Sequence, residues 1–273
     1  MKTSFIGGGV MAEAIMSRAI TQGVLHAAGV CVAEPVAERR TLLADRYGVA
    51  TSQDNLAAAC GARLIVLAVK PKHLPAVFAN LAGKLSPEQT VLSIVAGATL
   101  AGLTIGLAHR LVVRVMPNTP ARAGEGMSVW TATPEVGAEA RHAATALLAA
   151  MGTHLYVDDE AVLDMATAVS GSGPAYVFGF MEALADAAVD LGIPREMAQM
   201  LVLQTVLGSA VLAKATGEDP ALLREKVTSP GGTTAEALKA LEQAGFRDII
   251  KDAVRAAYAK AQALGRKGER GVQ

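Results

Sequence analysis

The chain has 273 residues, carries 25 Lys and Arg against 25 Asp and Glu, and is 52% hydrophobic. That length allows one large or two medium domains, and the apolar content excludes a disordered protein. The balanced charge excludes a broadly basic nucleic-acid surface, because binding phosphates demands an excess of Lys and Arg.

The first half of the chain alternates short apolar runs with amphipathic helical stretches. Continuous apolar runs are typical of strands buried on both faces of a parallel sheet, and their alternation with helices predicts a doubly wound α/β sheet. The predicted strands are Thr3–Ile6, Val30–Ala33, Leu64–Val69, Thr90–Val95, Leu111–Met116, Ser128–Thr131 and His154–Val157. The predicted helices between them are Val10–Thr21, Val36–Tyr47 and Pro134–Met151.

After about Asp158 no strand-like run is left, and the pattern predicts an all-helical second domain. Its predicted helices are Pro174–Leu191, Pro194–Ala215, Thr233–Ala244 and Phe246–Leu264. Pro174–Leu191 is apolar all round, and such a helix must be covered on all sides. In so thin a domain we expect the cover to be a second subunit.

The spacing of the cysteines and the lengths of the apolar runs argue against disulfide-rich, metal-binding, membrane and secreted proteins. Cys31 and Cys60 stand apart, and Cys and His show no metal-ligand spacing, so we expect neither a disulfide framework nor a metal site. The longest apolar runs, such as Leu64–Val69, are much shorter than the roughly 20 residues that cross a bilayer. Glu13 and the Gly7–Gly9 run interrupt the amino-terminal apolar stretch, which argues against a secretory signal. We expect a cytoplasmic protein with no membrane or nucleic-acid partner.

A glycine-rich turn follows the first predicted strand. Gly7-Gly8-Gly9-Val10-Met11-Ala12 fits the pattern G-x-G-x-x-G/A at the opening of a helix. A dinucleotide site needs a tight turn at Gly7, no side chain at Gly9 where the backbone approaches a pyrophosphate, and a small residue at Ala12. The helix N-terminus then favours the anion. We predict nucleotide binding; the alternative is a glycine turn without a ligand.

Glu34 follows the second predicted strand, about 20 residues beyond Ala12, where dinucleotide sites carry an acid. A carboxylate there accepts hydrogen bonds from a ribose 2′-OH and repels a 2′-phosphate, which favours NAD over NADP. Arg39 and Arg40 are the nearest cations that could offset it. The alternative is a solvated glutamate before the turn-forming Pro35.

Three further loops follow predicted strands. Ala68-Val69-Lys70-Pro71 can place Lys70 beside the nicotinamide ribose, and Ala96-Gly97-Ala98 has only small residues, as if a flat group passed close by. Met116-Pro117-Asn118-Thr119-Pro120 has its path fixed by two prolines. Each of the three loops alone can be a structural turn. In a doubly wound sheet, however, ligands bind outside the carboxyl ends of the strands, and we expect all three loops to lie there beside the glycine loop.

A second glycine-rich segment precedes a helix in the second half. Thr228-Ser229-Pro230-Gly231-Gly232-Thr233-Thr234 offers free backbone N–H groups, two hydroxyls and a helix dipole, which suit a carboxylate or phosphate. The alternative is a plain helix cap, which explains one Thr but not the whole segment. Ser170-Gly171-Ser172-Gly173-Pro174 is another small-residue turn into a helix.

In their order and spacing these segments resemble those of pyrroline-5-carboxylate reductases. The resemblance rests on the glycine loop, Val69–Pro71, Met116–Pro120, Ser170–Tyr176 and Ser229–Thr234. It covers essentially the whole chain, and the segment Leu222–Glu242 is highly specific to the family.

The resemblance implies a Rossmann domain over residues 1–158 and an all-helical substrate-binding and dimerisation domain over 159–273. It implies an interlocked homodimer, often assembled into a decamer of five dimers. It also implies hydride transfer from NADPH or NADH to the imine carbon of pyrroline-5-carboxylate, which gives L-proline in the last step of proline biosynthesis.

The resemblance and the loop arguments together give a set of candidate site residues. The cofactor candidates are Ile6, Gly7, Gly8, Gly9, Val10, Met11, Glu34, Asn55, Ala68, Val69, Lys70, Pro71, Ala96, Gly97 and Glu160. The substrate candidates are Ser229, Gly231, Gly232, Thr233 and Thr234. By the resemblance, the Thr234 hydroxyl reaches the ring nitrogen and is the catalytic candidate.

The chain departs from the family at two cofactor positions. Val10 stands where the family usually has a polar residue, and Glu34 stands where many members have Ser, Asn or Arg and favour NADPH. The first removes a contact near the phosphates, and the second leaves the choice between NADH and NADPH open.

Three other functions stay in view. A β-hydroxyacid dehydrogenase of the 6-phosphogluconate type needs a catalytic Lys on a helix of the second domain, and the segment Pro174–Ala213 has none. A non-catalytic nucleotide sensor would not need the Gly231–Thr234 segment as a substrate pocket. A reductase acting mainly on other imino acids, including six-membered ones, remains compatible with the sequence.

Overall fold

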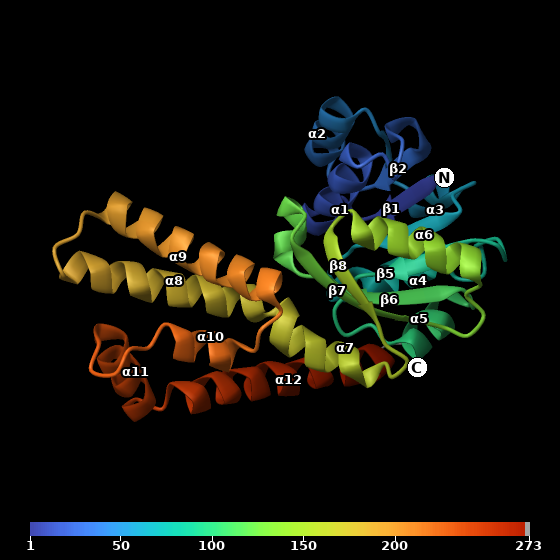
Figure 1. Cartoon of the computed structure of the whole chain (residues 1–273). Helices are drawn as coiled ribbons and strands as arrows, with labels where there is room; N and C mark the ends of the chain where they lie inside the picture. Colours follow the sequence, from blue (N-terminus) through green and yellow to red (C-terminus); the bar gives the residue numbers. More distant parts are fainter. Residues whose placement is uncertain (271–273) are drawn as a thin grey trace. The chain divides into compact units, whose positions relative to one another are not determined.

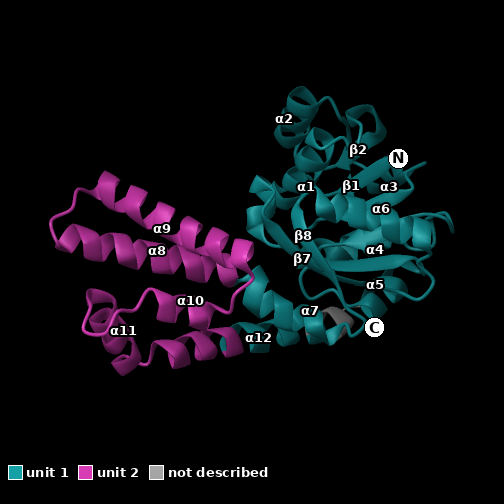
Figure 2. Cartoon of the chain, viewed as in Figure 1, with its two compact units in different colours: residues 1–172, 256–273 teal, residues 173–255 magenta. Residues whose placement is uncertain are grey.

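The computed structural model describes residues 1–270 and the side chains of residues 1–266. The chain forms two compact units: residues 1–172 with 256–273, and residues 173–255 (Figure 2). The predicted division at 158/159 differs from this one, because residues 159–172 group with the first unit. The assignment of separate roles to the two predicted domains stays a prediction.

The first unit is built on one eight-stranded sheet with the order β3-β2-β1-β4-β5-β6-β7-β8 (Figure 1). Its strands are β1 Thr3–Ile6, β2 Val30–Ala33, β3 Ala50–Ser52, β4 Leu64–Leu67, β5 Thr90–Ser93, β6 Val112–Met116, β7 Gly126–Ala132 and β8 Gly152–Tyr156. Neighbouring strands are parallel except β6 and β7, which pair antiparallel. The predicted doubly wound, mainly parallel sheet is confirmed.

The chain reverses its direction of travel across the sheet next to β1. It runs outward from β1 through β2 to β3, then returns to place β4 on the other side of β1. The connections that follow β1 and β4 therefore lead to helices on opposite faces of the sheet, and ligands of doubly wound sheets bind in the crevice at such a point.

Helices cover both faces of the sheet. One face carries α1 Val10–Thr21, α2 Ala37–Tyr47 and α6 Ala138–Ala149, and the other carries α3 Asn55–Ala59, α4 Leu74–Leu81 and α5 Leu100–Leu107. Because strand side chains alternate between faces, Phe5 packs in the first core and its neighbour Ile6 in the second. Strands buried on both faces explain the continuous apolar runs in the sequence.

The later helices are α7 Ala161–Ala166, α8 Gly173–Asp190, α9 Arg195–Thr216, α10 Pro220–Lys226, α11 Thr233–Gln243 and α12 Phe246–Arg270. A π-helical turn, Thr167–Gly171, lies between α7 and α8. The last strand ends at Tyr156, so the predicted change to an all-helical pattern is confirmed. The division between the two units falls inside α12, after Arg255.

The sequence predicted the first strand–helix–strand unit best. The bounds of β1, α1 and β2 match the prediction, while β4 ends at Leu67 and not at Val69, and α6 begins at Ala138 and not at Pro134. The elements β3, α3, α4, α5, α7 and α10 had no predicted bounds. The longest of them have eight residues, too few for a periodic pattern to stand out.

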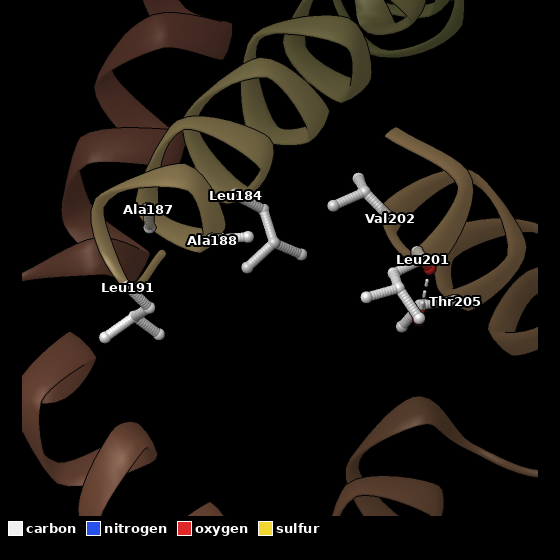
Figure 3. A pocket seen from close by; sticks show the side chains of 7 residues that line it. All are labelled: Leu184, Ala187, Ala188, Leu191, Leu201, Val202 and Thr205. Carbon is white, nitrogen blue, oxygen red and sulfur yellow. Dashed lines mark hydrogen bonds between the residues drawn. The ribbon is translucent and has the colours of Figure 1, made fainter. Parts of the chain in front are cut away.

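The second unit has a small core between α8 and α9, formed by Ala185, Ala198 and Val202. Many large apolar side chains of the same helices are exposed instead, among them Phe178, Met200 and Leu203. Figure 3 shows Leu184 and Val202 pointing toward one another across an open apolar pocket of about 250 Å³ between these two helices.

Candidate functional site

The glycine loop joins β1 to α1 at the carboxyl end of the sheet. Gly7 has φ +97°, a left-handed conformation that strains other residues, and a Cβ there would lie 2.9 Å from the Ala68 carbonyl oxygen. A Cβ at Gly8 would lie 2.9 Å from a Leu43 methyl and 3.2 Å from the Glu34 Cβ. The fold itself therefore requires glycine at position 7, while a side chain at position 8 would displace those of Leu43 and Glu34.

Gly9 is different, and it supplies the test of whether a dinucleotide fits. A Cβ at Gly9 would meet no atom within 4 Å, so nothing in the chain requires glycine there. Gly9 is also the N-cap of α1, so no N-cap side chain accepts the first N–H groups of that helix. An open glycine before uncapped helix N–H groups leaves space and hydrogen-bond donors for a pyrophosphate, so the residues present fit the cofactor.

Val10 and Met11 follow Gly9 as the first residues of α1. The Val10 side chain is 62% exposed, so an apolar group faces solvent beside the predicted phosphate position. Val10 and Met11 can therefore hold a phosphate only through their main-chain N–H groups.

Glu34, at the carboxyl end of β2, lies against the glycine loop. Its Oε2 accepts the Gly8 N–H at 2.9 Å, and its Oε1 accepts the Val36 N–H at 3.0 Å. Each carboxylate oxygen keeps a further lone pair for a ribose hydroxyl. Glu34 thus has the predicted place, and it also supports the loop, which the sequence did not predict.

The two arginines that could offset Glu34 are already engaged. Arg39 Nε donates to the Gly8 carbonyl at 2.6 Å, and its guanidinium pairs with Glu13 on α1. Arg40 Nη1 donates to the main-chain oxygens of Glu34 and Pro35. The charge of Arg39 is therefore paired within the chain, while Arg40 is held in place by neutral main-chain oxygens.

The remaining cofactor candidates of this half sit on the neighbouring loops. Asn55 opens α3, just beyond the end of β3, and β3 is tied to Glu34 by the Glu34 N–H bond to the Ser52 carbonyl at 2.9 Å. Ala68 and Val69 line the turn beside Gly7, and the Ala68 N–H donates to Ile6. Lys70 and Pro71 follow as an exposed turn, so these segments share one edge of the sheet.

The loop after β5 brings a partial correction. Gly97 has φ +73°, and a Cβ there would lie 2.8 Å from the Leu264 Cβ. The small residue at position 97 is therefore required by the close approach of α12. The sequence argument had instead expected a flat ligand at this place. Ala96 stays half-buried at the same edge. The assignment of Ala96 and Gly97 to the cofactor stays a prediction.

Glu160 lies in a charged cluster that the sequence did not predict. It forms an ion pair with Arg114 of β6 and accepts the Leu100 N–H of α5, and Arg114 also pairs with Asp164 of α7. The sequence feature that could have indicated this cluster is Arg114 itself, a charged residue inside the apolar run Leu111–Met116.

The Met116–Pro120 segment follows β6 and contacts the π-helical turn through Asn118 and Met116. Asn118 is buried; its Nδ2 donates to the Ser170 carbonyl at 3.2 Å and its Oδ1 accepts the Met127 N–H at 2.9 Å. A Cβ at Gly171 would lie 2.7 Å from the Met116 methyl. Gly171, in the small-residue turn predicted at 170–174, thus packs closely against Met116 within the first unit.

The substrate candidates form a separate segment in the second unit. Gly231 has φ +69°, Gly232 is the N-cap of α11, and no described side chain caps that helix. Thr233 and Thr234 are its first two residues, Ser229 accepts the Gly232 N–H through its main-chain oxygen at 3.0 Å, and Thr234 is half-buried. Uncapped N–H groups and hydroxyls at the start of an 11-residue helix suit a carboxylate.

Two features of the described residues bear on partner chemistry. Among the described residues, no group of three or more His, Cys, Asp or Glu side chains could hold a metal ion. One described helix, α9, is long and apolar enough to cross a membrane by length and composition, although the sequence predicted none. The first two residues of α9, Arg195 and Glu196, are charged. The exposed apolar side chains of α8 and α9 suit contact with a protein partner as well as they suit a membrane.

Comparisons with known proteins cover both halves of the chain. A family described as "Pyrroline-5-carboxylate reductase dimerisation" matches residues 160–264, and one described as "NADP oxidoreductase coenzyme F420-dependent" matches residues 2–97. Pyrroline-5-carboxylate reductases of Synechocystis sp. and Pseudomonas aeruginosa are 46% and 42% identical to the chain, over 98% and 96% of it and 99% and 96% of their own lengths.

Solved structures agree. A pyrroline-5-carboxylate reductase from Coxiella burnetii is 36% identical with a TM-score of 0.87, and covers 96% of this chain and 98% of its own. A pyrroline carboxylate reductase from Plasmodium falciparum with NADP bound is 31% identical with a TM-score of 0.88, over 97% of this chain and 98% of its own.

Proposed function

The chain belongs to the pyrroline-5-carboxylate reductase family, and on that basis we propose how its own residues reduce 1-pyrroline-5-carboxylate to L-proline. The observation that carries this function is the 46% identity to a reductase of that name across 98% of the chain. The enzyme uses a nicotinamide cofactor, and its product makes it the last enzyme of proline biosynthesis.

The glycine loop and the start of α1 hold the dinucleotide. The open Cα of Gly9 lets the backbone approach the pyrophosphate, and the first N–H groups of α1 donate to it. Ile6 to Met11, Asn55, Ala68 to Pro71, Ala96, Gly97 and Glu160 complete the proposed cofactor set. When bound, the reduced nicotinamide supplies the hydride.

The start of α11 holds the substrate. The N–H groups of Thr233 and Thr234 donate to the substrate carboxylate, and the Thr234 hydroxyl meets the ring nitrogen. Ser229, Gly231 and Gly232 shape the turn, in which the Gly232 N–H donates to the Ser229 carbonyl. In the iminium form of the substrate the nitrogen already carries a proton. Hydride transfer to the adjacent carbon then turns the C=N⁺–H group into the C–N–H group of proline. Such a reduction needs positioning and a proton at nitrogen and not a strong nucleophile.

For the cofactor we propose NADH in preference to NADPH. Glu34 carries a negative charge at the ribose position, and Arg39 and Arg40 are engaged by Glu13 and by main-chain oxygens. A 2′-phosphate would meet the Glu34 carboxylate, and the charge of Arg39 is already paired with Glu13. This separates the chain from the Plasmodium falciparum relative, which was solved with NADP bound.

For assembly we propose a homodimer through the helical unit, and five such dimers in a decamer. The exposed apolar side chains of α8 and α9 support self-association, because a soluble monomer rarely leaves large apolar patches open. We propose that the enzyme works in the cytoplasm, on a small soluble substrate and without nucleic-acid or membrane partners.

The decisive experiment supplies pyrroline-5-carboxylate with NADH and, separately, with NADPH, and follows the loss of reduced-nicotinamide absorbance. We expect oxidation of both, faster with NADH. A third reaction with the six-membered imine tests the alternative substrate. Folded protein that binds NADH and oxidises it only with the six-membered imine, or with neither, would overturn the assigned substrate.

A further inference from the structure

The guanidinium of Arg114 is buried in the middle of the sheet. Arg114 lies on β6 in register with Ser93 of β5 and Thr131 of β7, and its side chain is 6% exposed. Its Nη1 donates to Glu160 Oε1 at 2.7 Å and its Nη2 to Asp164 Oδ1 at 2.8 Å. A buried charge of this kind requires partners, and here two carboxylates at the start of α7 supply them.

Glu160 extends this cluster to a loop at the carboxyl edge of the sheet. The same Oε1 that takes Arg114 also accepts the Leu100 N–H at 2.7 Å. Leu100 is the first residue of α5, whose N-cap Thr99 bonds the Gly102 N–H. Glu160 therefore satisfies a helix N–H that Thr99 leaves unpaired, and it fixes the end of the 94–99 loop.

The 94–99 loop is held on its other side as well. A Cβ at Gly97 would lie 2.8 Å from the Leu264 Cβ and 2.9 Å from the Leu264 carbonyl carbon, so α12 packs directly against the loop backbone. Asp164 Oδ2 lies 3.9 Å from the Cβ position of Gly265, one residue further along α12. The loop is thus enclosed between α12 and the Arg114 cluster.

We propose that Arg114 is a positioning residue for the nicotinamide end of the dinucleotide site. It holds Glu160 where the carboxylate can bond Leu100, and so sets the path of the 94–99 loop that follows β5. Asp164 balances the charge of Arg114 but makes no bond to the loop. The inference rests on the proposed function, because it takes Ala96 and Gly97 to border the nicotinamide.

The test compares binding of NADH with binding of ADP-ribose, which lacks the nicotinamide. We expect Glu160→Ala and Arg114→Met to weaken NADH binding at least tenfold and to leave the Kd of ADP-ribose within twofold. Glu160→Gln keeps an oxygen for the Leu100 N–H and should recover most of the NADH affinity. Asp164→Asn is the matched control, and we expect it to leave both Kd values within twofold.

Amide hydrogen exchange in the free protein provides a readout independent of the cofactor. We expect faster exchange at Leu100 in Glu160→Ala and Arg114→Met, and unchanged exchange there in Asp164→Asn. If Arg114→Met does not fold, Arg114→Lys takes its place. Lysine keeps the charge but lacks the planar guanidinium fork that reaches Glu160 and Asp164 from separate nitrogens, so intermediate NADH affinity is then expected.

Three results would overturn the proposal. One is an Arg114 variant with the NADH affinity and the Leu100 exchange rate of the wild type, which would show that Glu160 does not depend on Arg114. Another is an equal loss of NADH and ADP-ribose binding, and the third is an Asp164→Asn protein that behaves like Glu160→Ala. Failure of the proposed function would appear differently, as a wild-type enzyme that binds no NADH or reduces no pyrroline-5-carboxylate.

Discussion

At the scale of single residues, Glu34 combines two tasks that pull in different directions. Its carboxylate supports the glycine loop by accepting the Gly8 N–H, and the same charge lies where we propose that the ribose binds. Replacing it therefore changes the loop and the selectivity together, unless the replacement keeps an acceptor. A glutamine keeps the acceptor and removes the charge, so the two tasks can be separated.

We expect Glu34→Ser to raise the ratio of kcat/KM for NADPH over that for NADH by at least about tenfold, or about 1.4 kcal/mol. The reason is the loss of repulsion toward the 2′-phosphate. Glu34→Gln is the control for loop support, and we expect the same shift in ratio with a smaller loss of total activity. Steady-state kinetics with both cofactors measures it, and an unchanged ratio in both variants would remove Glu34 from cofactor selection.

Thr234 is the residue on which the chemical step depends in our proposal. We expect Thr234→Ala to lower kcat and raise the KM of the substrate, with a combined loss of roughly 10- to 150-fold, the range for a hydrogen bond to a charged group. The Kd for NADH, measured by fluorescence, should not change. Thr234→Ser retains the hydroxyl and should keep most of the activity; kinetics equal to wild type in the alanine variant would exclude the role.

At the scale of secondary-structure elements, α1 and α2 are joined by one carboxylate. Glu13 of α1 accepts hydrogen bonds from Tyr47 and Arg46 and pairs with Arg39, all three on α2. Burial opposes ionisation of Glu13, but the hydrogen bonds from Tyr47 and Arg39 and the charges of Arg39 and Arg46 outweigh it and lower its pKa. The link holds α2 beside the glycine loop, since Arg39 also bonds Gly8.

A lowered pKa in the folded state makes this link pH-dependent. The stabilisation by Glu13 is complete above the pKa of an unfolded glutamate, about 4.3, and is lost as the pH falls through the lower folded value. We expect Glu13→Gln to lower Tm by several degrees at neutral pH, with the difference shrinking below about pH 4. Thermal unfolding of both proteins across pH measures it.

The matched control for that series is Glu38→Gln, which removes an exposed carboxylate from α2. It should change Tm little at any pH, because exposed charges contribute little to stability. A difference between wild type and Glu13→Gln that is constant with pH would contradict the assigned ionic link.

At the scale of the whole molecule, the helical unit cannot bury its own apolar surface. Three small side chains form the core between α8 and α9, while Phe178, Phe180, Met200, Leu203 and others of comparable size are exposed. Burying one such side chain gives about 1.5–3 kcal/mol, which favours a second copy as the cover. The family matched by residues 160–264 is itself described by dimerisation, so self-association belongs to this unit.

We expect the double variant Leu203→Glu/Leu207→Glu to be largely monomeric in light scattering at micromolar concentration, where the wild type is a dimer or larger. Both residues are more than half exposed on one stripe of α9. Binding of NADH to the first unit should survive in the variant. Leu42→Glu, on an exposed position of α2, is the control and should keep the wild-type mass; a monomeric wild type would end the proposal of assembly.

Much of this protein follows from local sequence. Apolar runs of strand length, the glycine loop and the change of pattern near Asp158 predict the sheet, the dinucleotide site and the helical half, because each depends on residues close together in the chain. The segment Ser229–Thr234 is equally local, since a glycine turn and a helix start lie within six residues. Glu34 was placed correctly for the same reason, at the end of its own strand.

Tertiary structure alone decided which distant groups meet. Arg114 finds carboxylates about 50 residues away, Gly97 is small because α12 returns against it, and Glu34 bonds a glycine 26 residues earlier. No local pattern specifies such pairs, since they depend on strand order and on where helices dock after the chain has turned many times. The sequence therefore determined the class of fold, most strands and the long helices, and it predicts two ligand-binding segments. The fold determined which side chains hold those segments in place.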